Sequence, residues 1–365
     1  MRLAVCGFDL LRCQAYKPLT INGHGRQKLP AGICRQYQFF ELRYAMENSM
    51  KEALQNCNLC PRHCGADRLA GAKGYCGQTA EIRAARAALH FWEEPCISGT
   101  NGSGTVFFTG CSLRCIFCQN RESALDGQAI QNGHVPAKSR HGKVITVDRL
   151  SEIFLELQEK GTHNINLVTP THFIPQIRAA LIAAKENGLS IPIVYNTGGY
   201  EEVESLRMLD GLIDIYLPDL KYRSTEAAAR FSNAPDYFEK ASLALQEMYR
   251  QVGDPIFEEA TGLMKKGMIV RHLLLPGQVG ESKRVLRYLH ETFGNHVYVS
   301  IMNQYTPMPQ LIENPAFEDI ARKVTDEEYQ RLLDFAEAIG IELGFCQEGE
   351  TAKESFIPPF SCEGL

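Results

Sequence analysis

The sequence predicts an α/β protein built around a partial (β/α)6 barrel of the TIM type, with a small cysteine-rich module in front of it. Short apolar runs recur from Thr105 onward. Segments with apolar residues at i, i+3 and i+4 lie between them and close on a glycine. Seven of the 13 cysteines fall into two tight clusters, which predict the module and a second cysteine site in the barrel.

Six runs are apolar on consecutive positions, as expected for strands that are covered on both faces. They are TVFFTG (105–110), INLVTP (165–170), IPIVYNTGG (191–199), LIDIYLPDLK (212–221), MIVRHLLLPG (268–277) and HVYVSIMNQ (296–304).

The segments between and after these runs predict helices. They cover 146–161, 174–188, 200–211, 233–253, 282–294 and 325–340, and the last opens with Thr325 and Glu328 in the spacing of a capping box.

Four parts of the chain follow from these patterns. We expect a loosely ordered extension over residues 1–45, a cysteine-rich metal-binding module over 46–98, the barrel over 99–350 and a C-terminal tail over 351–365.

Charge and hydropathy favour a cytoplasmic protein. A formal net charge of −5 gives no global attraction to nucleic acid or to an anionic membrane. No apolar run approaches the roughly 18 residues of a membrane span, and the first residues are too weakly apolar for a secretory signal. We therefore expect neither a nucleic-acid nor a membrane partner.

The stretch GCSLRCIFCQN places Cys111, Cys115 and Cys118 on one loop after the first predicted strand, spaced C-x3-C-x2-C. A [4Fe–4S] cluster takes one thiolate per iron, so three cysteines leave one iron open to another ligand. The spacing predicts an open iron–sulfur site.

The other cluster, CNLCPRHC followed by GYCG, contains Cys57, Cys60, Cys64 and Cys76. Four thiolates with glycine and proline turns between them predict a closed site for zinc or for an auxiliary Fe–S cluster. The alternative is a set of reduced thiols that pack a small module.

Polar residues follow the predicted strands, at the edge where active sites of such barrels lie. They are Thr169 to His172, Asn196 to Gly199, Asp219, Lys221 and His272. Structural alternatives are an ion pair for Asp219 with Lys221 and a core histidine for His272. Trp92, Glu93 and Glu94, before Pro95, are expected on the solvated surface, with the substrate cleft as the alternative.

The three-cysteine loop, with an aromatic residue before its last cysteine, resembles the radical S-adenosylmethionine (SAM) superfamily. The stretch SGTNGSGTVFFTGCSLRCIFCQNRE, with LPDLKY and RHLLLPG downstream, is similar to glycyl-radical-enzyme activating proteins over about residues 85–345. Within them it looks most like the pyruvate formate-lyase-activating-enzyme-like subgroup, in which the first cysteine cluster is also typical.

The resemblance implies that Cys111, Cys115 and Cys118 hold a [4Fe–4S] cluster whose open iron binds the amino and carboxylate groups of SAM. One electron from the reduced cluster would then cleave SAM to a 5′-deoxyadenosyl radical, which abstracts hydrogen from the substrate.

The resemblance also implies cofactor-binding roles for single residues. Asp219 in DLK matches an aspartate that helps bind a monovalent cation beside SAM, and His272 matches a histidine near the SAM ribose. The family's GGE, which holds the SAM amino group, is replaced by TPTH, so Thr171 or backbone carbonyls must serve instead. The remaining expected cofactor contacts are Phe117, Asn196, Thr197 and Lys221; no catalytic side chain is assigned.

One substrate hypothesis is a glycine on a partner enzyme, with flavodoxin or ferredoxin as electron donor. The alternative is a radical SAM enzyme that acts on a small molecule or another peptide. A third hypothesis, from a different class, is a non-catalytic metal-binding or redox-sensing protein.

Overall fold

The computed structural model describes residues 50–124, 142–347 and 358–365. The chain divides into Met1–Met50 and Lys51–Leu365, and every element below belongs to the second unit. The predicted extension over residues 1–45 lies outside the described residues, as does 351–357 of the predicted tail. Among the helices of the described ranges, none combines the length and the apolar character that crossing a membrane requires.

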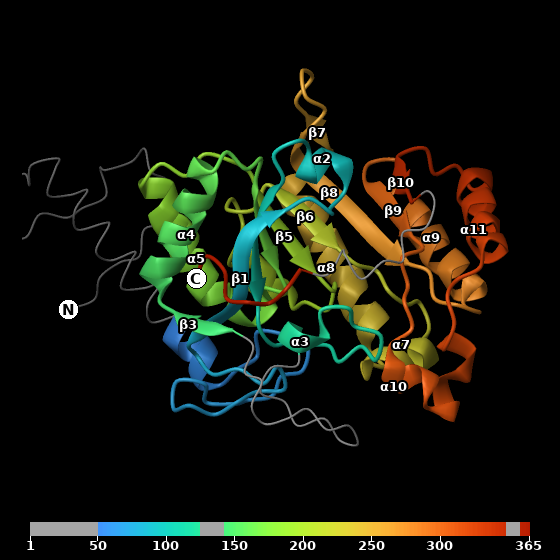
Figure 1. Ribbon diagram of the computed structural model, residues 1–365, viewed down its shortest axis with the longest axis horizontal. Coiled ribbons are helices and arrows are strands. Elements are labelled where there is room, and N and C mark those ends of the chain that lie inside the picture. The colour runs from blue at the N-terminus through green and yellow to red at the C-terminus, as the bar shows by residue number, and fades with distance from the viewer. Residues whose placement is uncertain (1–49, 125–141, 348–357) are drawn as a thin grey trace, which may run out of the picture. The chain divides into compact units, whose positions relative to one another are not determined.

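Ten strands form the sheet at the centre of the described residues (Figure 1). They are β1 (Ile82–His90), β2 (Ser103–Phe108), β3 (Lys143–Ile145), β4 (Ile165–Val168), β5 (Ile193–Thr197), β6 (Ile215–Pro218), β7 (Ile256–Phe257), β8 (Met264–Leu273), β9 (Tyr298–Met302) and β10 (Gly344–Cys346).

The strand order is β10-β9-β8-β6-β5-β4-β2-β1-β3, and β7 pairs with β8 outside that path. Each predicted run overlaps one strand, and β2, β4, β5, β6, β8 and β9 pair in parallel in that order. The end strands β10 and β3 do not pair with each other in the described residues, so the sheet is open. The predicted α/β fold with an open, mostly parallel sheet is confirmed.

The helices whose bounds lie within the described residues stand between and after the strands. They are α2 (Pro95–Ser98), α3 (Arg121–Ala124), α4 (Val147–Glu159), α5 (Ile174–Glu186), α6 (Val203–Arg207), α7 (Thr225–Ser232), α8 (Tyr237–Val252), α9 (Val279–Phe293), α10 (Pro309–Ile312) and α11 (Asp326–Ala338), with 3-10 turns η1 (Thr171–Phe173) and η2 (Pro315–Ile320).

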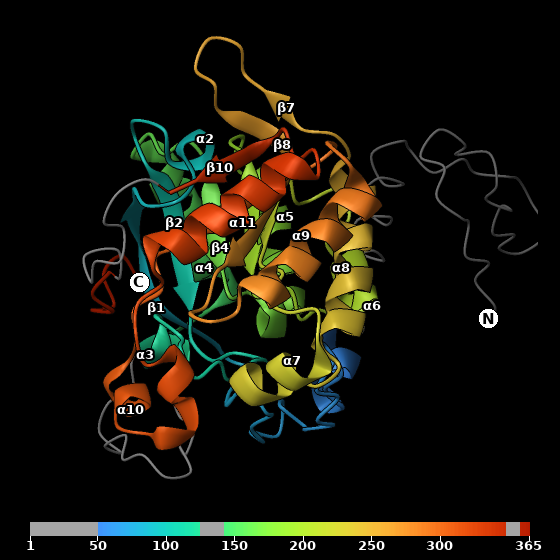
Figure 2. The same cartoon turned by 90° about the vertical axis from the view of Figure 1, so that its right-hand side faces the viewer.

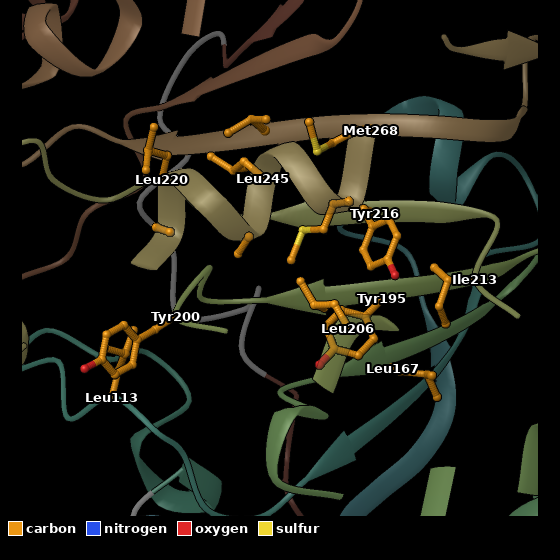
Figure 3. Close-up of a cluster of buried hydrophobic side chains, with 14 of the residues drawn as sticks. Leu113, Leu167, Tyr195, Tyr200, Leu206, Ile213, Tyr216, Leu220, Leu245 and Met268 are labelled. Carbon is orange, nitrogen blue, oxygen red and sulfur yellow. The ribbon is translucent and has the colours of Figure 1, made fainter. Parts of the chain in front are cut away.

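Strand pairing separates the sheet into two faces, because residues that pair side by side point the same way. Tyr195 pairs with Tyr216, which pairs with Met268. These side chains pack with Leu206 and Leu245 of α6 and α8, on the outer face (Figure 3). The opposite, inner face carries a second apolar cluster, formed by Val194, Ile215, Leu217, Met264 and Ile269 with Cys96 and Ile97 at α2.

The two ends of the sheet differ in what covers them. Figures 1 and 2 both place residues 50–80, α3 and α7 at one end, and α2 with β7 at the other. The first end receives the carboxyl ends of the parallel strands, since α7 follows β6 and α3 follows the loop after β2. Active sites of β/α folds lie at this end.

Strand β1 is an addition that the sequence did not reveal. It runs antiparallel to β2 and lies within residues 46–98, the predicted cysteine-rich module. Alanine-rich IRAARAALH favours a helix by propensity alone. Pairing with β2 on one side and β3 on the other overrides this preference. Ala84, Ala85 and Ala87 are fully buried in the sheet. The division of the chain into module and barrel stays a prediction.

Candidate functional site

The three-cysteine loop begins where β2 ends. Gly110 turns the chain with φ of +83°, and a Cβ there would lie 2.6 Å from the carbonyl oxygen of Cys76. Only glycine accepts this combination of dihedral and close approach. The backbone N–H of Ile116 then donates to the carbonyl of Phe231 on α7. The loop is therefore held at its start by the turn at Gly110 and at its middle by α7.

The three sulfurs share one electrostatic environment. Burial and the charges of its two neighbouring thiols raise the pKa of Cys111, and burial with the charge of Cys115 raises that of Cys118 to about 12. Lys221 acts against both shifts. A nearby cation and a metal are the two influences that convert such thiols to thiolates.

These residues fit a [4Fe–4S] cluster. Three thiols lie on one loop, the backbone N–H of Leu113 points at the Cys111 sulfur at 3.4 Å, and Lys221 supplies positive charge. In the described chain, no three Cys, His, Asp or Glu side chains gather tightly enough to hold one metal ion. A cubane cluster does not require that, since each thiolate binds a different iron.

A network of charges occupies the inner face at the strand ends. Lys221 Nζ donates to Asp219 Oδ2 at 2.6 Å, and Arg271 Nε donates to Asp219 Oδ1 at 3.0 Å. Arg271 Nη2 also donates to Asn196 Oδ1 at 2.6 Å. Burial raises the pKa of Asp219, but the two cations outweigh it and hold that pKa below the ordinary value. The hydrogen bonds of this network bring Asn196, Asp219 and Lys221 together, as their positions after the predicted strands suggested.

Glu93 and Glu94 are not on the solvated surface, where the sequence placed them. The side chain of Glu93 is 8% exposed, and its carboxylate accepts hydrogen bonds from Asn166, Asn196 and Arg271. The chain enters the inner face between β1 and α2, and burial of the apolar residues at α2 carries both acids with it. The surface expectation is therefore wrong for these two acids, and the cleft alternative stays a prediction.

Thr171 and Thr197 lie close together but face a buried acid. Both hydroxyls donate to Glu201 Oε1, and the phenol of Tyr195 donates to Oε2. Burial raises the pKa of Glu201 to about 7 despite these three donors. Since each threonine has one hydroxyl proton, only its lone pairs are left for SAM. Sequence reasoning missed Glu201, because YEE reads as the solvent side of a helix start.

The two histidines are both buried. Nε2 of His172 donates to the carbonyl of Thr109 at 2.7 Å, which steadies the start of the cysteine loop, so His172 is not a surface residue. Nδ1 of His272 donates to the carbonyl of Leu220 at 2.7 Å. Its Nε2 has no protein partner among the described residues.

His272 borders a small cavity, about 200 Å³ with its mouth. Lys221, Gln278 and Glu281 also line it. Phe117 is buried in the cysteine loop, with its ring edge-on to Tyr305 at 6.1 Å between centroids. The expected SAM contacts thus divide between the inner face and this cavity, and they stay predictions.

The first cysteine cluster lies beside the barrel loop. Cys57, Cys60 and Cys76 are buried and Cys64 is exposed. A Cβ at Gly74 would lie 2.7 Å from the Cys64 sulfur and 3.8 Å from the Cys76 sulfur, so the absent side chain leaves room where two sulfurs meet.

A buried cation accompanies this cluster. The Arg68 guanidinium is 1% exposed and lies 3.8 Å from the Cys57 sulfur. Burial raises the pKa of the Cys76 thiol and Arg68 lowers it. Bound metal would complete the conversion to thiolates, so the donor set fits a thiolate-ligated metal.

Comparison with known proteins decides the family. Residues 105–289 match the model of the radical SAM superfamily, a span of half the chain that begins with β2 and the three-cysteine loop. The chain belongs to the radical SAM superfamily. Membership implies an enzyme with a [4Fe–4S] cluster and SAM as cofactors.

Individual relatives of this radical SAM protein are distant. It is 27% identical over 320 residues, 84% of each chain, to the uncharacterized protein MJ0674 of Methanocaldococcus jannaschii. Among solved structures, Streptococcus suis SuiB matches with a TM-score of 0.42 and 14% identity over 66% of this chain and 47% of SuiB. HydG, a maturase of the [FeFe]-hydrogenase, matches with a TM-score of 0.42 and 13% identity over 69% and 53%. The chain spans about half the length of both.

Proposed function

We propose that this radical SAM protein cleaves SAM at Cys111, Cys115 and Cys118 and abstracts a hydrogen atom from a polar substrate bound on the inner face. The observation that carries the proposal is the three-thiol loop at the carboxyl end of β2, with Lys221 beside it. A reduced [4Fe–4S] cluster bound there supplies the electron that cleaves SAM.

The chain's own residues hold the loop and the charges around it. Gly110 and His172 fix the start of the loop, and α7 fixes its middle. Lys221 and Arg271 keep Asp219 ionised, which leaves a fixed dipole at the strand ends. A monovalent cation at Asp219 would share the carboxylate with Lys221 and Arg271, since each carboxylate oxygen already has one of them as partner.

Two substrate classes remain open. The resemblance to glycyl-radical-enzyme activating proteins favours a glycine on a partner enzyme, and an electron donor such as flavodoxin or ferredoxin would serve either class. The buried carboxylate of Glu94, one oxygen of which has no partner in the described residues, favours a small polar molecule or a polar side chain, because a glycine backbone is neutral and brings no charge to it.

Cluster content and SAM cleavage test the proposal. Anaerobically reconstituted protein should bind about four irons at the barrel loop, and its reduced electron paramagnetic resonance (EPR) spectrum should shift when SAM is added. Cys111→Ala, Cys115→Ala and Cys118→Ala combined should lose that iron and all SAM cleavage. Cys346→Ala, at an exposed cysteine outside both clusters, should behave like the wild type. A triple variant that still cleaves SAM would show that these three cysteines are not the ligands of the cluster that cleaves it.

The substrate class has its own readout. A glycine substrate should produce a protein-based radical in the EPR spectrum of a partner mixed with the enzyme and SAM. A small substrate should instead transfer deuterium from its labelled C–H bond to 5′-deoxyadenosine. Wild-type protein that binds iron but never cleaves SAM under reducing conditions would support the non-catalytic alternative.

A further inference from the structure

The inner face holds two hydrogen-bond acceptors that the protein does not satisfy. Glu94 Oε2 and Asn166 Oδ1 are buried and have no partner in the described structure. Glu94 is 8% exposed and Asn166 is fully buried. Leaving such atoms unpaired is unfavourable, so two of them in one region call for a partner from outside the protein.

Both acceptors adjoin Glu93. The amide nitrogen of Asn166 donates to Glu93 Oε1 at 2.9 Å. Burial raises the pKa of Glu94, while Arg271 and Ser300 lower it and the charge of Glu93 raises it. Glu94 therefore lies near Arg271 and Ser300, which pair in the sheet. The register therefore places Glu94 on the face that carries Asp219 and Arg271, not among the helices.

The acids at this place outnumber the cations when all of them are ionised, and burial raises the pKa of Glu94. In the described residues, Arg271 donates to Glu93, Asp219 and Asn196, and Lys221 donates to Asp219. Glu94 forms no ion pair within these residues, so a bound cation would favour its ionised form. A positively charged hydrogen-bond donor would satisfy the two free acceptors and the missing charge together.

The arrangement is not that of a metal site. Within the described residues, no three Cys, His, Asp or Glu side chains are gathered for a single metal ion. Two separate acceptors, one charged and one an amide oxygen, match the diverging N–H groups of an ammonium or guanidinium instead.

We propose that Glu94 and Asn166 form a subsite for a cationic nitrogen group, an ammonium or guanidinium, of the substrate. This rests on the proposed function and narrows it: the substrate is an amine or guanidine compound, or a peptide that inserts a lysine or arginine side chain. Glu93 is the positioning residue that orients Asn166 and ties it to Arg271.

Calorimetric titration of the full chain, loaded with cluster and SAM, tests the subsite with two probes, methylguanidinium and methylammonium, at fixed ionic strength. At least one should bind saturably, and acetamide, a neutral donor, should bind more weakly. Glu94→Gln should lower the affinity about tenfold or more, because the charge-assisted bond is lost. Asn166→Leu should lower it as well, because the second acceptor is removed.

The control is Glu159→Gln, which removes the same charge from the exposed end of α4 and should leave the affinity unchanged. Circular dichroism and iron content establish that each variant is folded. Failure of both cations to bind wild-type protein that cleaves SAM would overturn the subsite alone. Unchanged affinity in both Glu94→Gln and Asn166→Leu would overturn it as well. Cation binding by a protein that never cleaves SAM would instead overturn the proposed function.

Discussion

Asp219 is the residue on which the strand-end network depends, because it alone bridges Lys221 and Arg271. Its two partners come from the loop after β6 and from β8. Removing the carboxylate therefore takes from Lys221 its ion-pair partner in the described residues and leaves Arg271 with Glu93 as its acid, and truncating one partner of a buried pair is costly. The cluster ligands are on another loop and should not be affected directly.

We expect Asp219→Ala to weaken SAM binding about tenfold, the cost of one charged hydrogen bond, without loss of iron. Equilibrium dialysis of labelled SAM, in potassium and in sodium salts, measures this. Asp210→Ala, at a half-exposed ion pair with Arg250, is the control. Equal SAM affinity in wild type and Asp219→Ala, in either salt, would leave Asp219 a structural ion pair.

Sequence position predicted Asn196, Asp219 and Lys221, since polar residues directly after apolar runs converge at one edge of a parallel sheet. It did not single out Arg271, which sits inside the run MIVRHLLLPG. A charged residue in the middle of a buried strand was itself the missed signal, because it requires buried acids as partners. Glu93 and Glu94 are those partners, and their place depends on how a distant segment folds over the sheet.

At the scale of elements, helices and strands with a periodic apolar pattern and clear end signals could be predicted from the sequence. Elements whose local sequence is atypical for their structure could not. The capping box at Thr325 and Glu328 begins α11 as predicted. Strand β1 was missed because its alanines contradict strand propensity, and pairing with β2 depends on contacts remote in sequence. Strand β10 is three residues long and has no pattern of its own.

Helix α11 gives a stability prediction. Glu328 accepts hydrogen bonds from Arg322, from the backbone N–H of Thr325 and from that of Gly277. The Arg322 guanidinium first, and then the two backbone donors, lower its pKa to about 2 against the opposing effect of burial. Glu328→Gln should therefore destabilise the protein by about 1 kcal/mol at pH 7, the usual worth of a cap.

The pH dependence has a fixed sign. An acid whose pKa is lower in the folded state stabilises the fold above its unfolded pKa, and that contribution is lost as pH falls toward 2. Urea unfolding at pH 7 and pH 4 measures the free energy of unfolding of wild type and Glu328→Gln. The difference between the two proteins should be smaller at pH 4. Glu327→Gln, exposed on the same helix, is the control. A larger difference in the free energy of unfolding at low pH would contradict a stabilising role of ionised Glu328 at the start of α11.

On the scale of the whole molecule, the first cysteine cluster and the barrel loop are mechanically joined. Arg62, between Cys60 and Cys64, donates to the carbonyls of Ser112 and Asn233. Its guanidinium stacks on Tyr75 at 4.0 Å, and that of Arg114 on the barrel loop stacks on the same ring at 3.9 Å. Displacing the first cluster would therefore move the three-cysteine loop.

Metal content decides what the first cluster is. About eight irons and no zinc per chain would make it an auxiliary Fe–S cluster. Such a site has no free coordination position, so its role would be to pass electrons to the barrel. Cys57→Ser with Cys60→Ser should then leave SAM binding intact but slow turnover, measured as 5′-deoxyadenosine formed per reduced cluster.

A zinc site would give different results in the same samples. One zinc with about four irons per chain would make the module structural, and the double variant should then lose thermal stability while its folded fraction still cleaves SAM at the wild-type rate. Cys96→Ser, at a buried cysteine on the inner face, is the control for loss of a thiol alone. Four free thiols at Cys57, Cys60, Cys64 and Cys76 in native protein, with only the barrel iron present, would contradict both assignments and leave packing as the role of the cluster.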